Sequence, residues 1–129
     1  MSKPSQSAHG AAMLQLLVSS PHAVLVFLER KQVLASRDPH VVAAYALALS
    51  RTQRATEALA VWQHLLSLRP EDVEVACAVA DAAIDASAFA DAVQALELCF
   101  QLDARAETPA GRRARVLAVK LDKTLARRG

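Results

Sequence analysis

The sequence predicts an all-helical protein, built as a stack of helical hairpins with a C-terminal capping helix. Hydrophobic residues make up 53% of the 129 residues, while aromatic residues are 4% and glycines number three. This composition is typical of helices rich in Ala and Leu rather than of a turn-rich β protein. A pattern of small and bulky residues begins at residue 39 and is repeated from residue 73. Repeated units of fixed length form stacks, because a single unit cannot bury its apolar face by itself. We therefore expect one domain over residues 1–129, with about seven helices and no strands.

The clearest unit spans residues 39–72. We expect this unit to form two helices joined by a turn. Small residues in each helix let the two approach closely, and bulky residues fill the remaining space between them. Asp38-Pro39 is a helix start signal, because Asp caps a helix and Pro suits its first turn. The positions that carry the pattern are Val42, Tyr45, Ala46, Leu49, Ala58, Trp62 and Pro70.

A second unit spans residues 73–106 and repeats the same spacings with smaller side chains. Phe89 lies three residues before its second-helix alanine, and Ala104 stands where the first unit has Pro70. The repeated positions are Ala76, Val79, Ala80, Ala83, Ala92 and Leu96. This second copy is in register with the first, so we expect a second hairpin of the same kind.

Flanking segments complete the prediction at both ends. Over residues 107–129 we expect a capping helix that begins at Thr108-Pro109, with Ala114 one period after Ala80 and an apolar stripe at helical spacing. Over residues 1–38 we expect a degenerate helical pair, formed by Gly10 to Val18 and Pro21 to Ala35.

These spacings match the tetratricopeptide-repeat (TPR) pattern. The stretches Ala76 to Asp81 and Phe89 to Leu96, followed by the helix from Thr108, resemble the small TPR chaperones of bacterial type III secretion. The resemblance implies a non-catalytic protein that holds an extended or apolar segment of a secreted translocator in a concave groove. Dimerisation through the N-terminal helices is common in the family, so a homodimer or a small co-chaperone is a further expected partner. A generic TPR adaptor, or a co-chaperone of needle subunits or export components, remains an alternative.

The resemblance also implies which side chains line the groove, because the first helix of each TPR faces the concave side. In the first repeat these positions are His40, Ala43, Leu47, Ser50 and Arg51. In the second repeat they are Glu74, Cys77, Asp81, Ile84 and Asp85, and in the capping helix Arg115, Ala118 and Val119. Small and apolar residues among charges of both signs suit an extended peptide. The chain's own N-terminal segment is an alternative occupant of this groove.

Charge is distributed unevenly along the chain. Residues 71–107 carry one Lys or Arg and nine Asp or Glu, whereas residues 108–129 carry seven and one. This asymmetry indicates either a polarised binding surface or charge matching between neighbouring helices, in which Arg112 to Arg115 face the acidic repeat. No aromatic residue is interleaved with the basic ones for base stacking, so we do not expect nucleic-acid binding.

Motifs of catalysis and of cofactor or metal binding are missing from the sequence. It contains no glycine-rich phosphate loop, no G-x-S-x-G turn, no H-E-x-x-H helix and no C-x-x-C pair. We therefore expect no enzyme, no cofactor and no metal. Cys77 and Cys99 are too few for a disulfide framework, which favours a reducing cytoplasm. Gln15 interrupts the apolar stretch near the N-terminus and no cleavage site follows, so we expect neither a signal peptide nor a membrane span.

Overall fold

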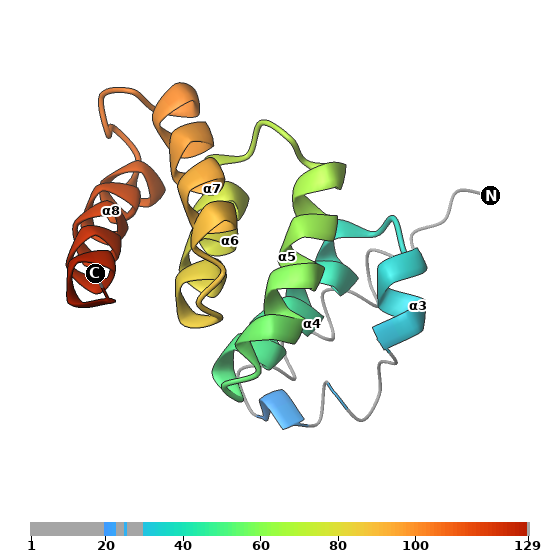
Figure 1. Cartoon of the computed structure of the whole chain (residues 1–129). Helices are drawn as coiled ribbons and strands as arrows, with labels where there is room; N and C mark the ends of the chain where they lie inside the picture. Colours follow the sequence, from blue (N-terminus) through green and yellow to red (C-terminus); the bar gives the residue numbers. More distant parts are fainter. Residues whose placement is uncertain (1–19, 23–24, 26–29, 129) are drawn as a thin grey trace. The chain divides into compact units, whose positions relative to one another are not determined.

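A computed structural model describes residues 20–22, 25 and 30–128 of the chain (Figure 1). Within these residues all regular structure is helical and no strand is present, which confirms the predicted all-α class. The helix expected from Gly10 to Val18 lies outside the described residues. Of the helix expected from Pro21 to Ala35, the structure describes separate pieces, the last being α3, Arg30–Ala35. The total of about seven helices for the whole chain therefore stays a prediction.

The chain forms two compact units, with the boundary between Arg69 and Pro70. In the first unit α3 packs against the hairpin of α4 and α5, and in the second α6, α7 and α8 all contact one another. The helices of the first hairpin are α4, Pro39–Arg51, and α5, Ala55–Leu68. The second unit contains α6, Val73–Asp85, α7, Phe89–Leu102, and α8, Pro109–Arg128.

The two hairpins are structural copies of each other at the spacing seen in the sequence. The helices α4 and α6 are both 13 residues long, and α5 and α7 are both 14. Every bound of the second hairpin is shifted from its counterpart by the same interval, which is the distance along the chain from Pro39 to Val73. The sequence repeat therefore corresponds to one helix–turn–helix unit.

An aspartate begins the first helix of each hairpin. Asp38 Oδ1 accepts the backbone N–H of His40 at 3.0 Å, and Asp72 Oδ1 accepts that of Glu74 at the same distance. These bonds satisfy N–H groups that the helix itself leaves unpaired, which fixes where α4 and α6 start.

The turn inside each hairpin is also repeated, down to its backbone conformation. Gln53 and Ser87 are non-glycine residues with left-handed φ angles of 61° and 59°. The residue after each of them donates its backbone N–H to the end of the preceding helix. Arg54 donates to the carbonyl of Leu49 at 2.9 Å, and Ala88 donates to the carbonyl of Ala83 at 2.8 Å. This is the Schellman arrangement, which ends a helix sharply and reverses the chain.

The core of each hairpin is built around fully buried alanines. Ala46 and Ala58 have no exposed surface in the first hairpin, and the same is true of Ala80 and Ala92 in the second. Larger side chains surround them, with Leu49 and Val61 completely buried in the first hairpin. Helices can approach closely where both carry a small residue, so these positions set the spacing within each pair.

The long helix α8 buries one stripe and exposes the rest. Its buried residues are Ala110, Gly111, Ala114, Leu117 and Leu121. Ala114 and Leu117 are fully buried and stand one repeat interval after Ala80 and Ala83, so α8 continues the burial pattern of a first helix. Among the described helices, none combines the length and the hydropathy that a membrane span requires.

The left-handed turn residue gives a stability test. We expect Ser87→Gly to stabilise the second unit by about 0.5–1 kcal/mol, because glycine adopts a positive φ without steric cost and this gain exceeds its added freedom in the unfolded chain. Its neighbour Ala86 has a φ of −85°, so Ala86→Gly is the matched control and is expected to destabilise. Thermal unfolding followed by circular dichroism measures both, and destabilisation by Ser87→Gly would contradict the turn geometry.

Candidate protein-binding surface

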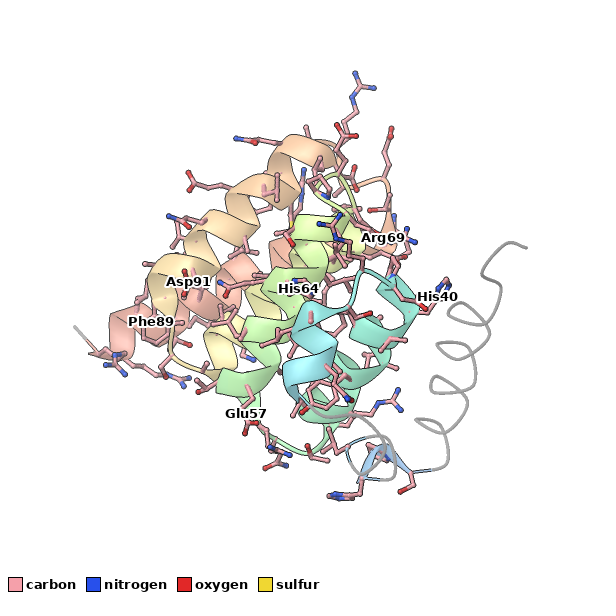
Figure 2. All side chains as sticks on the ribbon, turned by 90° about the vertical axis from the view of Figure 1, so that its right-hand side faces the viewer. His40, Glu57, His64, Arg69, Phe89 and Asp91 are labelled. Carbon is pink, nitrogen blue, oxygen red and sulfur yellow. The ribbon has the colours of Figure 1, made fainter. Side chains whose placement is uncertain are left out.

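The predicted groove positions of the first unit lie along one side of α4. Ala43 and Leu47 are half-buried, while Ser50 and Arg51 are exposed. His40 stands at the start of this side, where its side chain is 44% exposed and projects from the helix end (Figure 2). This side of α4 therefore offers a short apolar strip with polar groups at both ends.

Contacts inside the unit hold parts of this side in place. The indole N–H of Trp62 donates to Ser50 Oγ at 3.1 Å, which fixes the end of α4 against α5. Ring atom Nε2 of His64, labelled in Figure 2, lies 2.8 Å from the carbonyl of Ser36 and joins α5 to the turn before α4. Ser50, which the TPR resemblance places in the groove, accepts this indole N–H and is exposed at the end of α4.

On α6 the predicted positions divide into accessible and buried residues. Glu74 and Asp85 are exposed and Asp81 is half-buried, so three carboxylates follow one side of the helix. Cys77 and Ile84 lie on the same side but are only 7% and 6% exposed. A partner that approaches α6 would therefore meet mainly the carboxylates.

Two of the three carboxylates of α6 face basic residues of α8. Asp81 Oδ2 lies 3.4 Å from the guanidinium of Arg113, and Asp85 Oδ1 lies 3.6 Å from the ammonium of Lys120. The uneven charge of the sequence allowed either a polarised binding surface or charge matching between neighbouring helices. These two ion pairs show that charge matching is present. The four side chains are 39–56% exposed, so each pair contributes at most about 1 kcal/mol and both signs stay accessible to a partner.

The predicted positions on α8 have different environments. Val119 is 54% exposed and Ala118 is half-buried. Arg115 is exposed, but its guanidinium donates to the carbonyl of Ala104 at 3.0 Å. Arg112 likewise donates to the carbonyl of Glu107 at 3.0 Å. Two of the basic residues thus hold the loop before α8, a role that the charge pattern did not predict.

Asp103 organises that loop and so positions the start of α8. Its carboxylate accepts the hydroxyl of Thr108 at 2.6 Å and the backbone N–H groups of Thr108 and Glu107 at 2.9 Å each. These hydrogen bonds, above all those from Thr108, hold the pKa of Asp103 below its ordinary value of 3.8. Gly111 is required beside it, because a Cβ there would overlap the Asp103 carboxylate.

The two cysteines of the second unit are buried, free thiols. Burial raises the pKa of Cys77, and burial together with the neighbouring Cys77 raises the pKa of Cys99 to about 12. Both thiols are therefore protonated near neutral pH and poorly nucleophilic. Among the residues that the structure describes, no three His, Cys, Asp or Glu side chains gather closely enough to hold a metal ion.

Comparisons with protein-family models, with curated proteins and with solved structures find no match to this chain.

Asp103 predicts a pH dependence. Because its pKa is lower in the folded state, its contribution to stability is complete above about pH 4 and is lost as the pH falls through the folded-state pKa. We expect Asp103→Asn to lower the melting temperature at pH 7, because the amide cannot accept all three hydrogen bonds.

The difference between the two proteins should shrink as the pH falls well below 3.8. Asp91→Asn, which changes an acidic residue in the first turn of α7, is the control for the loss of one charge. A gap between wild type and Asp103→Asn that stays constant down to the lowest pH measured would contradict this role.

Proposed function

We propose that this chain is a non-catalytic protein-binding module of the TPR type. The observation that carries the proposal is the repetition of one hairpin, with identical helix lengths, aspartate caps and left-handed turns in both copies. Repeats of this kind are used as scaffolds whose side-chain surface binds a partner. The two units each offer one side of a first helix that carries accessible polar groups.

The chemistry of these sides supports a polypeptide as the ligand. The side of α4 combines half-buried Ala43 and Leu47 with the exposed Arg51, and the side of α6 presents its three carboxylates. The shallow apolar surface can contact the side chains of an extended segment. The charged groups can hydrogen-bond to its backbone and form ion pairs with its basic residues. This alternation is less suited to a small molecule, which binds in a deep and mainly apolar pocket.

We propose more specifically that the module is a cytoplasmic chaperone of type III secretion, which holds an apolar segment of a secreted client until export. The resemblance of residues 73–127 to that class supports this assignment. Binding would act by competition, because a segment held on the chaperone cannot pair its apolar surface with other copies of the client.

Co-purification from the native host, followed by mass spectrometry after a moderate salt wash, tests the assignment. A stoichiometric, hydrophobic secreted protein is the expected companion. A stable assembly without such a client would favour the adaptor, and needle or export components in its place would favour the co-chaperone. Either result would overturn the translocator-chaperone proposal while leaving the helical fold untouched.

Charge reversal on α6 tests which surface binds. We expect Asp81→Lys combined with Asp85→Lys to lower the affinity for the co-purified client at least tenfold, because the accessible negative side of α6 is inverted. Melting temperature should fall by several degrees but the fold should be retained, because two half-exposed ion pairs worth at most about 1 kcal/mol each become contacts between like charges. Isothermal titration calorimetry and thermal unfolding measure the two effects.

The matched control adds Arg113→Asp and Lys120→Asp to the same variant, which restores both ion pairs with their signs exchanged. We expect client binding to stay weak, because α6 remains positive. Recovery of full affinity would mean that the substitutions acted through the packing of α8 and not through the surface of α6, and unchanged affinity in the first variant would exclude this surface.

A further inference from the structure

Two helices of the second unit keep apolar side chains exposed at helical spacing. On α8, Val116 and Val119 are 57% and 54% exposed. On α7, Val93 and Phe100 are 42% and 38% exposed. On α8 the pair lies on the side opposite the buried residues, whereas on α7 Val93 and Phe100 border the buried Leu96. Each pair forms a short exposed strip along its helix.

The strip on α8 is basic. Lys123 and Arg127 continue it at successive helical turns after Val119, and we call Val116, Val119, Lys123 and Arg127 the basic stripe. Over its whole length α8 contains seven Lys or Arg and one Asp. Arg113 and Lys120 are paired with α6, whereas Lys123 and Arg127 are exposed and have no partner among the described residues.

The strip on α7 has the opposite sign. Glu97 is exposed between Val93 and Phe100, and we call these three residues the acidic stripe. The charged residues of α7 are Asp91 and Glu97, and the helix contains no Lys or Arg. Glu97 has no partner among the residues that the structure describes.

We propose that the basic stripe of one copy of this chain binds the acidic stripe of a second copy. In an antiparallel pairing, Phe100 lies over Val116 and Val119, Glu97 lies beside Lys123, and Val93 lies over the aliphatic part of Arg127. Burial of the apolar side chains drives the contact, and the opposite charges select its partner and direction. The inference concerns self-association and does not depend on the proposed client.

A second copy fits because it supplies both halves of the contact. The stripes are different surfaces of the same molecule, so the interface is heterologous and each copy offers one stripe of each kind. One helix against one helix makes a small interface, for which dissociation constants between about 10 µM and 1 mM are expected. The association is therefore reversible and depends on protein concentration.

Sedimentation of the full chain over this concentration range tests the proposal. The average mass should rise from 13.8 kDa, the mass of one chain, as the concentration increases. Phe100→Glu and Val116→Glu should each weaken the association at least tenfold. Val116 is 57% exposed and its variant should keep full stability, whereas Phe100 is 38% exposed and its variant should be somewhat less stable but folded. Circular dichroism and melting temperature check the fold of each variant.

Charge exchange identifies the pairing. Glu97→Lys alone and Lys123→Glu alone should both weaken self-association, because like charges then meet across the contact. A mixture of the two variants should associate again, because the lysine introduced in place of Glu97 then faces the glutamate introduced in place of Lys123. Glu71→Lys and Arg69→Glu change exposed charges elsewhere and are the controls, expected to behave like the unmodified chain.

Three results would overturn the proposal. The first is a mass that stays at 13.8 kDa across the whole range. The second is association that Val116→Glu weakens while Phe100→Glu and Glu97→Lys do not, which would place another surface opposite α8. The third is a mixture of the charge variants that associates no more strongly than either variant alone.

Discussion

The close approach of two helices at buried alanines is the constraint on which the rest of the structure depends. Four alanines are fully buried between paired helices, Ala46 and Ala58 in one hairpin and Ala80 and Ala92 in the other. Larger side chains at these positions would push the helices apart. The aspartate caps and the left-handed turns act in support, because they fix where each helix begins and ends and thereby keep the alanines opposite each other.

The sequence predicted much of this arrangement because the spacing of small residues and the caps are local signals. The repeat starts expected at residues 39 and 73 coincide with the first residues of α4 and α6. Side-chain accessibility was less predictable, because the burial of Cys77 and Ile84 depends on what packs against α6. The loop network of Asp103 was also missed, since a carboxylate that binds N–H groups four and five residues later has no recognisable spacing.

The ion pairs of the second unit join two helices and still leave their charges partly exposed. The acidic side of α6 is matched by Arg113 and Lys120, yet all of these side chains remain partly exposed. Pairs of this kind rearrange easily, because water already solvates both partners and little energy is lost when one is exchanged for another. An approaching molecule can thus compete for either sign without disturbing the apolar contacts that hold the helices together.

The placement of the rare side chains gives each unit its own natural probe. Trp62, the only tryptophan of the chain, is 8% exposed in the first unit, and both cysteines are buried in the second. Indole fluorescence therefore reports the opening of one unit, whereas the rate at which a thiol reagent reaches Cys77 and Cys99 reports the opening of the other. Whether the two units open together or separately can be read from the unmodified protein, without attaching a label to either.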